Sequence, residues 1–466
     1  MPAQNTDSGF FDYLLNLTTT GLKVEALKEG SVCFPRVPLL IITGPLALCQ
    51  LIETPLLNLI NFATLVSTNA SRMRRAVGPD TKLLEFGLRR AQGPNGALSA
   101  SHYSIIGGFD GTSNVLAGKI FNIPISGTHS HSFVNSFTTL EPLSDEAVIL
   151  HKPNGETVNL FKLSKDLRPE ILNLINCSKT PKESELLAFC TYAATYPDNC
   201  LCLIDTYSTL GSGLPNFLAV AAALAQHGYT AKGIRIDSGD LSYISKQVRK
   251  SFKKIENHDP VKYKNFSKIL ITASNSVNEE TLYCLNEQGH EIDAFGIGTH
   301  LVTCQAQPAL GGVYKMVQMN GTPRMKLTED VSKITLPGVK TAYRLYNSSD
   351  QPVVDVMLRN DESPPKVGKN FLLRHPFVES KRAYIAPFKV EKLHQIVFEN
   401  DEILVDEDIS TIKQRVADSL IKMRKDHLRR MNPTPYKVSL SSDMYWSLWG
   451  FVFPDLFFIR TEGEVI

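Results

Sequence analysis

The chain has 466 residues, and its hydrophobic share of 43% and charged share of 21% are ordinary for a soluble globular protein. Its 49 lysines and arginines against 47 aspartates and glutamates leave a formal charge of +2, so no overall field attracts nucleic acid or an acidic membrane. The N-terminus shows no signal-peptide pattern and the eight cysteines offer no complete zinc-ligand set, so we expect reduced thiols and a cytosolic protein.

The first long element that the sequence predicts is a helix over residues 53–72, where apolar residues recur at helical spacing. Four later apolar runs are typical of parallel strands buried on both faces: 200–207, 232–239, 268–275 and 292–299. Helical patterns separate them, over residues 216–228 and after Ser276, whose spacing from Glu279 suits a capping box. Strand starts recur at roughly thirty residues, which predicts an irregular (β/α) barrel, with a doubly wound open sheet as the alternative.

The flanking regions have a different pattern. Residues 20–45 and 311–348 are predicted to form β hairpins, the second with an Asn320–Gly321 turn, and to pair in a smaller mixed α+β domain. Residues 350–440 are expected to mix polar helices with proline-rich connectors. The aromatic stretch 444–460 is too short and too interrupted for a membrane span, so we expect it to pack against the fold or a partner. The predicted divisions are 1–50 (remainder of the N-terminal flanking domain), 51–309 (barrel), 310–440 (return to the flanking domain and C-terminal helices) and 441–466 (aromatic tail).

Each of the four predicted parallel strands ends on polar residues. Asp205 ends the first, Arg235 and Asp237 lie near the end of the second, Ser274 ends the third and Thr299 the fourth. Barrel enzymes place their sites at the carboxyl ends of the strands. The sequence therefore predicts a site at this end of the barrel.

Two motifs in this set indicate anion binding. Gly296 and Gly298 before Thr299 would let backbone N–H groups approach a phosphate, although the motif is not a Walker loop. Arg235 can clamp a planar carboxylate with two parallel hydrogen bonds. Asp237 and Asp240 could bind ribose hydroxyls or magnesium, and a purely structural Arg–Asp pair is the alternative.

A third motif, SGTHSHSF at residues 126–133, contains two histidines. A metal site at His129 and His131 lacks a third nearby ligand, so one histidine that accepts a phosphoryl group or a proton fits better. Asp205 is a candidate to orient its ring. The basic run 246–254 is interpreted as a solvated helix face.

Longer motifs resemble one family. They are LLEFGLRRAQGPNGALSASHYSIIGGFDGTSNVLAG (83–118), PISGTHSHSFV (124–134), LPNFLAVAAAL (214–224), GIRIDSGDL (233–241), FGIGTHLVT (295–303), GGVYKMV (311–317) and PRMKLTED (323–330). Together they resemble nicotinate phosphoribosyltransferase, particularly the animal type, in unbroken order over roughly residues 10 to 440. The resemblance implies a type II phosphoribosyltransferase, an irregular α/β barrel with a mixed flanking domain that forms homodimers with composite sites.

The resemblance also implies a reaction and its residues. Nicotinate and 5-phosphoribosyl 1-pyrophosphate would give nicotinate mononucleotide and pyrophosphate for NAD biosynthesis, with Mg²⁺ or Mn²⁺ and with ATP as co-substrate. His131 matches the histidine that ATP phosphorylates, and Thr128 and Arg235 match the positions that hold nicotinate. The positions implied for phosphoribosyl pyrophosphate are Thr299, Gly296, Gly298, Asp237, Ser274, Lys315 and Lys326.

The sequence departs from the family pattern at both ends. Family members begin with an Asp-Leu-Tyr segment, whose aromatic residue stacks on the pyridine ring of the neighbouring subunit's site, and this sequence starts after that point. The aromatic stretch after Ser442 also differs from the family's usual C-terminus. The alternatives are therefore a truncated, non-catalytic or weakly active protomer, or a relative that uses nicotinamide.

Overall fold

The structure is a computed structural model that describes residues 7–138, 148–326 and 334–452. The chain forms two compact units, one from Ala63–Leu310 and the other from Met1–Phe62 together with Gly311–Ile466. The predicted motif at 323–330 and the aromatic tail extend partly outside the described residues. Among the described residues, no helix is long and apolar enough to cross a membrane.

A six-stranded parallel sheet forms the centre of the unit Ala63–Leu310, in the order β4-β3-β10-β9-β8-β7. Its strands are β3 (Lys82–Glu85), β4 (Gly111–Thr112), β7 (Leu201–Leu203), β8 (Gly233–Ile236), β9 (Leu270–Ala273) and β10 (Ala294–Ile297). The last four lie inside the predicted apolar runs. Of the polar residues that end those runs, Asp205, Asp237 and Ser274 lie in the loops just beyond the strands. Both edges of the sheet, β4 and β7, are closed in part by the segment from Pro124 to His129, described below.

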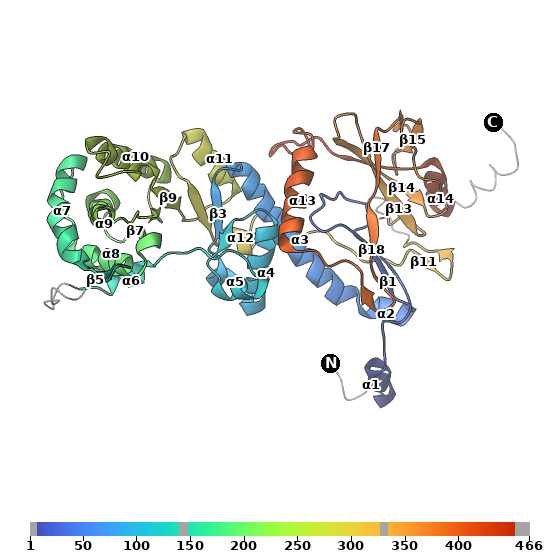
Figure 1. Ribbon diagram of the computed structural model, residues 1–466. Coiled ribbons are helices and arrows are strands. Elements are labelled where there is room, and N and C mark those ends of the chain that lie inside the picture. The colour runs from blue at the N-terminus through green and yellow to red at the C-terminus, as the bar shows by residue number, and fades with distance from the viewer. Residues whose placement is uncertain (1–6, 139–147, 327–333, 453–466) are drawn as a thin grey trace, which may run out of the picture. The chain divides into compact units, whose positions relative to one another are not determined.

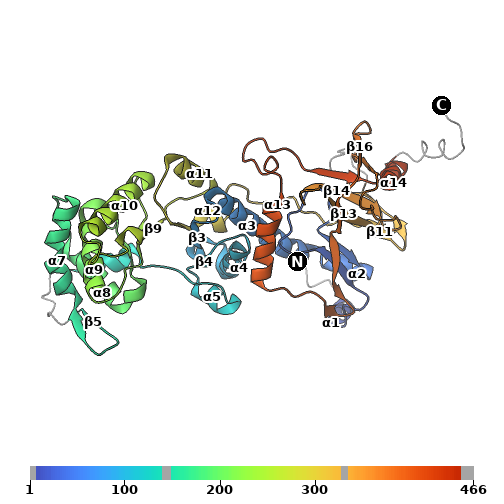
Figure 2. The ribbon, with the colours of Figure 1, turned by 45° about the horizontal axis from the view of Figure 1, so that its top comes forward.

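Helices surround this sheet. They are α3 (Glu53–Val77), α4 (Gly93–Ile106), α5 (Val115–Phe121), α6 (His131–Asn135), α7 (Leu160–Ile175), α8 (Glu183–Thr195), α9 (Leu214–Gln226), α10 (Leu241–His258), α11 (Glu279–Gln288) and α12 (Thr299–Val302). In Figures 1 and 2, α7, α8 and α10 gather around α9, whereas α4, α5 and α12 lie near β3. Every residue from Leu214 to Leu224 in α9 is buried, as its continuous apolar sequence requires.

The predicted capping box at the start of α11 is wrong. Asn278 is the N-cap, and its side-chain oxygen accepts the backbone N–H of Thr281 at 2.8 Å. Ser276 lies two residues earlier, with a positive φ of 49°. Asparagine is as good an N-cap as serine, so the two candidates could not be separated by residue type alone.

The other unit contains two larger sheets. The first has the order β19-β18-β1-β2, and its strands are β1 (Lys23–Leu27), β2 (Leu40–Thr43), β18 (His394–Glu399) and β19 (Glu402–Ile403). The second has the order β16-β15-β20-β14-β13-β17, and its strands are β13 (Lys340–Tyr346), β14 (Pro352–Arg359), β15 (Phe371–Arg374), β16 (Arg382–Ile385), β17 (Lys389–Lys392) and β20 (Lys437–Leu440). Helices α1 (Ser8–Leu15), α2 (Leu46–Leu51), α13 (Ile409–Lys422) and α14 (Ser442–Val452) complete the unit.

Sequence patterns predicted this second unit only in part. The hairpin β1–β2 forms as expected, and β11 (Gln318–Met319) pairs with β12 (Thr322–Pro323) across the predicted Asn320–Gly321 turn, where both φ values are positive. The expectation that these two regions pair with each other is wrong, because β1 pairs with β2 and β18. The expectation of several polar helices over 350–440 is also wrong, since the seven strands from β14 to β20 lie there and α13 is its only described helix.

Candidate functional site

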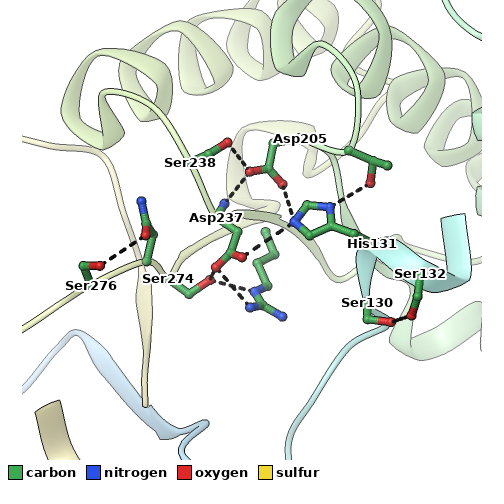
Figure 3. Close-up of polar contacts among 11 residues, drawn as sticks. Ser130, His131, Ser132, Asp205, Asp237, Ser238, Ser274 and Ser276 are labelled. Carbon is green, nitrogen blue, oxygen red and sulfur yellow. Dashed lines mark hydrogen bonds and ion pairs between the residues drawn. The ribbon is translucent and has the colours of Figure 1, made fainter. Parts of the chain in front are cut away.

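Polar side chains converge at the carboxyl ends of β7, β8 and β9 (Figure 3). The Asp205 side chain, just beyond β7, is 1% exposed. One of its oxygens, Oδ2, accepts the backbone N–H of Asp237 at 3.0 Å and the hydroxyl of Ser238. The other oxygen, Oδ1, is buried without a hydrogen-bond partner among the described residues. A buried carboxylate with a bare oxygen is costly unless a cation or donor approaches it, which marks this point as a ligand position.

His131 is the first residue of α6, and its ring lies between the two aspartates (Figure 3). Its Nε2 is 3.8 Å from Oδ1 of Asp205 and 3.6 Å from Oδ2 of Asp237. Its Nδ1 is 3.0 Å from the hydroxyl of Thr206. The side chain is 41% exposed, so the ring is held in place and still accessible to a ligand. The sequence placed Thr206 at the polar end of the run 200–207 but indicated no role for it.

Arg235 on β8 is held by its neighbours. Its Nε donates to Oγ of Ser274 at 2.7 Å, and its Nη2 donates to Oδ1 of Asp237 at 3.2 Å. The hydroxyl of Ser274 in turn donates to the same Asp237 oxygen at 2.5 Å. Neither Arg235 nor Asp237 is fully buried, with side chains 18% and 28% exposed. The guanidinium therefore has a fixed plane and further N–H groups for a ligand.

Phe86, at the end of β3, is a site residue that the sequence reasoning missed. The Arg235 guanidinium carbon lies 5.2 Å from the centre of its ring. Gly296 makes room for this ring, since a Cβ there would come within 2.3 Å of a ring carbon. Phe86 is aromatic, whereas the other strand ends are marked by polar residues, and the run LLEF followed by glycine was the available signal.

Glu85 stabilises the loop after Phe86 through a hydrogen bond from the backbone N–H of Gly87. It is fully buried, and it accepts the N–H of Gly87, the hydroxyl of Ser101 at 2.8 Å and that of Thr112 at 2.5 Å. Three donors satisfy a buried carboxylate well, so this end of β3 is rigid.

The predicted phosphate motif follows β10. Gly296 is buried within the strand, Gly298 is the N-cap of the four-residue helix α12, and Thr299 begins that helix with its side chain exposed. A Cβ on Gly298 would lie 3.1 Å from the carbonyl oxygen of Phe86. Glycine at this position therefore lets the β3 and β10 ends approach each other closely.

The two residues before Ser130 face β7. The hydroxyl of Thr128 donates to the carbonyl of Leu201 at 2.5 Å, and Nε2 of His129 accepts the N–H of Leu203 at 3.2 Å. Burial lowers the pKa of His129 to about 4, so its ring is neutral near pH 7. Among the described residues, no group of three or more His, Cys, Asp or Glu side chains could hold a metal ion.

Three other predicted residues make none of the contacts described above. Asp240 caps α10 by accepting the N–H of Tyr243 at 2.9 Å, so its carboxylate already has a structural role. Lys315 and Lys326 belong to the other unit, where both are exposed. The structure thus brings together His131, Asp205, Arg235, Asp237 and Ser274.

Comparisons with known proteins give a consistent picture. The model of the Nicotinate phosphoribosyltransferase (NAPRTase) family matches residues 81–357, and models of the N-terminal and C-terminal domains of nicotinate phosphoribosyltransferase match residues 2–61 and 339–448. The chain is 51% identical over 451 residues to nicotinate phosphoribosyltransferase of Dictyostelium discoideum, covering 94% of this chain and 74% of that protein. It is 42% identical to the Homo sapiens enzyme of that name over 439 residues, covering 94% and 81%.

A solved structure agrees with these sequences. The crystal structure of human nicotinic acid phosphoribosyltransferase superposes with a TM-score of 0.86 at 38% identity, covering 98% of this chain and 86% of that one. A nicotinate-nucleotide pyrophosphorylase from Pyrococcus furiosus, at 20% identity and a TM-score of 0.56, shares the fold. The predicted fold class, an irregular α/β barrel with a mixed flanking domain, is confirmed by the first match.

Proposed function

The chain belongs to the nicotinate phosphoribosyltransferase family, and from this premise we infer that it joins nicotinate to 5-phosphoribosyl 1-pyrophosphate, forming nicotinate mononucleotide and pyrophosphate. The observation that supports this function best is the convergence of a carboxylate-reading arginine, an aromatic ring and a histidine between two aspartates at one end of the parallel sheet. This set of side chains is suited to bind a pyridine carboxylate, a phosphorylated sugar and a phosphoryl donor.

We propose that Arg235 and Phe86 hold nicotinate. The Nη1 group of Arg235 makes no hydrogen bond within the described part of the chain, so it can donate to the nicotinate carboxylate together with a remaining Nη2 hydrogen. Phe86 lies against the same guanidinium and offers a face on which the pyridine ring can stack. Because the Thr128 hydroxyl already donates to Leu201, its contact with nicotinate would use backbone atoms. The pyridine nitrogen has a free lone pair, so no general base is required.

The phosphoribosyl pyrophosphate site is proposed at the ends of β8, β9 and β10. Asp237 and Ser274 would face the ribose, and the backbone at Gly296 and Gly298 with the Thr299 hydroxyl would bind the 5-phosphate. Lys315 and Lys326 are proposed for the pyrophosphate. The bond from the anomeric carbon to pyrophosphate breaks through an oxocarbenium-like state while the pyridine nitrogen bonds to that carbon. Catalysis is then mainly placement and stabilisation of the departing anion.

His131 is proposed to accept a phosphoryl group from ATP. With the hydrogen on Nδ1 donated to Thr206, Nε2 has a lone pair that forms an N–P bond to the γ-phosphorus. The bond between that phosphorus and the β–γ bridging oxygen breaks, its electrons leave with ADP, and the Nδ1 hydrogen stays on the ring. Hydrolysis of the phosphohistidine would couple ATP to the transfer.

A divalent cation, Mg²⁺ or Mn²⁺, fits the site. The unpartnered Oδ1 of Asp205 and Oδ2 of Asp237 both face His131, and two carboxylates would otherwise repel the phosphates of ATP. Magnesium is usually bound by one or two carboxylates together with substrate phosphates, and it would neutralise charge on the phosphoryl oxygens. Asp205 and Asp237 would hold it.

We further propose a cytosolic homodimer with composite sites. Exposed apolar side chains on and after α5 support a protein–protein contact, namely Val115, Leu116, Ile120 and Ile125, with exposures of 53 to 66%.

The direct test measures nicotinate mononucleotide formed by the purified chain from nicotinate, phosphoribosyl pyrophosphate and Mg²⁺, with and without ATP. We expect product that ATP stimulates, and little product when nicotinamide replaces nicotinate. His131→Ala should lose ATP stimulation and retain ATP-independent synthesis. Absence of product from a folded chain that binds nicotinate would overturn the proposed activity, and ATP stimulation in His131→Ala would overturn the role of His131.

A further inference from the structure

The segment from Pro124 to His129 spans the open sheet between its two edge strands. At one edge, the N–H of Thr112 in β4 donates to the carbonyl of Pro124 at 3.0 Å, and the N–H of Ser126 donates to the carbonyl of Thr112 at 2.9 Å. At the other edge, the segment reaches β7, which within the described sheet pairs with β8 alone. The segment therefore completes the barrel where a further strand would stand.

The contact with β7 is made by side chains instead of a backbone ladder. The outer edge of β7 presents the carbonyl of Leu201 and the N–H of Leu203. Thr128 donates to that carbonyl, and Nε2 of His129 accepts that N–H. An edge strand with unpaired backbone groups in a buried place is unfavourable, so these two side chains replace the missing strand partner.

His129 is also fixed by packing. The residue is 9% exposed, and its ring centre lies 4.9 Å from that of Tyr192, 5.2 Å from that of Phe133 and 5.9 Å from that of Phe189. As the acceptor of the Leu203 N–H, Nε2 has no hydrogen, so the neutral ring has its hydrogen on Nδ1. Both the aromatic contacts and the hydrogen bond fix the backbone two residues before His131.

His131 is then tied to the same strand a second time, through the bond between its Nδ1 and Thr206, three residues beyond β7. We propose that His129 is a positioning residue, which docks the closing segment on β7 and thereby sets Nε2 of His131 between Asp205 and Asp237 for phosphorylation by ATP. This inference rests on the proposed function of His131. If His129 were a purely structural core histidine, its substitution would destabilise the fold and would not lower the ATP-dependent step more than the ATP-independent one.

The test compares two substitutions at His129. His129→Leu keeps an apolar side chain among the aromatic rings and removes the acceptor. In His129→Gln, the side-chain oxygen can take the place of Nε2 as the acceptor. Two quantities are measured for each purified variant: acid-labile phosphate incorporated into the protein from ATP labelled in the γ-phosphate, and nicotinate mononucleotide synthesis without ATP.

His394 provides a matched control in the other unit. It is 4% exposed, and its Nε2 hydrogen bonds with the carbonyl of Pro38 at 2.8 Å, so His394→Leu also removes one backbone hydrogen bond of a buried histidine. Thermal unfolding of all three variants separates loss of stability from loss of phosphorylation.

We expect His129→Leu to lower phosphate incorporation at least tenfold, with ATP-independent synthesis changed less than threefold. His129→Gln should recover most of the incorporation, and His394→Leu should incorporate phosphate like the wild type. An equal loss of both activities in His129→Leu, or no recovery in His129→Gln, would overturn the positioning role. Failure of the wild type itself to incorporate phosphate would instead overturn the proposed role of His131.

Discussion

Two of the Arg–Asp pairs, one in each unit, differ in their hydrogen bonds and in their exposure to solvent. Arg344 on β13 donates from Nε and Nη2 to the two oxygens of Asp355 on β14, both at 2.8 Å, and Nη2 also donates to the carbonyl of Val32 at 2.9 Å. Arg235 and Asp237 share one hydrogen bond of 3.2 Å. The Arg344 and Asp355 side chains are 8% and 0% exposed, against 18% and 28% in the other pair.

The two arginines also differ in the number of aromatic rings that lie against them. The Arg344 guanidinium lies 5.5 Å from the Phe34 ring and 6.0 Å from the Tyr436 ring, and these two rings stack on each other at 3.7 Å. Among the residues that the structure describes, Arg235 has one aromatic ring nearby, that of Phe86. A closed pair with bidentate bonds and buried partners stabilises the fold, whereas an open pair with a fixed plane is prepared for a ligand. Residue types do not distinguish the two pairs; the bidentate hydrogen bonds and the exposed fractions of the side chains do.

The largest effect is expected at the closed pair. Arg344→Leu leaves the Asp355 carboxylate buried without its cation, which should lower the free energy of unfolding by about 3 to 5 kcal/mol. Urea denaturation of the variant measures this loss. In the double variant Arg344→Leu with Asp355→Leu, no buried charge remains, so most of the stability should return. A loss below about 1 kcal/mol in the single variant would show that the closed pair is not structural.

The open pair should show the opposite pattern. Arg235→Ala should lower kcat/KM for nicotinate by roughly 100-fold, about 3 kcal/mol, because a desolvated carboxylate loses its charged partner. Steady-state kinetics measures this effect, and the free energy of unfolding should change by less than about 1 kcal/mol. Arg235→Lys keeps the charge and loses the fork, so it should recover only part of the activity. A variant with unchanged kcat/KM and reduced stability would make this pair structural as well.

This contrast also shows how far the sequence alone could be read. Apolar runs ending on Asp205, on Arg235 with Asp237, and on Ser274 located the sheet and one end of the site, because a buried parallel strand needs a continuous apolar run. The sequence left open whether Arg235 was structural. Whether Arg235 binds a ligand depends on its surroundings, which include Phe86. Phe86 is distant in sequence and contacts Arg235 only after the strands assemble.

Other features could not be predicted because they depend on neighbours that are distant in sequence. The role of His129 follows from an unpaired edge of β7, which no local pattern reveals. The strands in residues 350–440 were mistaken for helices for a similar reason: β14 pairs with β13 on one side and with β20 on the other. Its burial on both faces removes the alternation of polar and apolar residues by which a half-buried strand is recognised.

Glu185 is a buried carboxylate that differs from the carboxylates of both pairs. Glu185 is fully buried and its Oε2 accepts hydrogen bonds from two neutral groups, the Ser212 hydroxyl at 2.5 Å and the Asn216 amide at 3.2 Å. Burial, its largest cause, raises the pKa of Glu185 to about 7, and the charge of Asp205 adds to the rise. The folded protein therefore binds a proton more tightly here than the unfolded chain does.

The sign of the resulting pH dependence follows from this. Because the folded pKa is above the unfolded value of 4.5, Glu185 should lower stability progressively as pH rises from about 4.5 to about 7, and then no further. Between pH 5 and pH 8 the contribution is about 2 kcal/mol. Glu185→Gln should remove this part of the pH dependence in urea denaturation at the two pH values. An unchanged pH dependence in the variant would mean that Glu185 is ionised in the folded protein.

The smallest effect is expected from substitutions of the aromatic rings. These substitutions again distinguish the ligand-binding role of Arg235 from the structural role of Arg344. Phe86→Leu removes a stacking face worth about 1 kcal/mol, so KM for nicotinate should rise roughly fivefold while stability changes little. Phe34→Leu removes one ring of the stacked pair over Arg344, and it should lower stability without changing that KM. If Phe86→Leu leaves KM unchanged and destabilises the protein, then Phe86 has a structural role beside Arg235, as Phe34 has beside Arg344. The pyridine ring would then have to stack on another side chain, and the open side of Arg235 would bind the carboxylate alone.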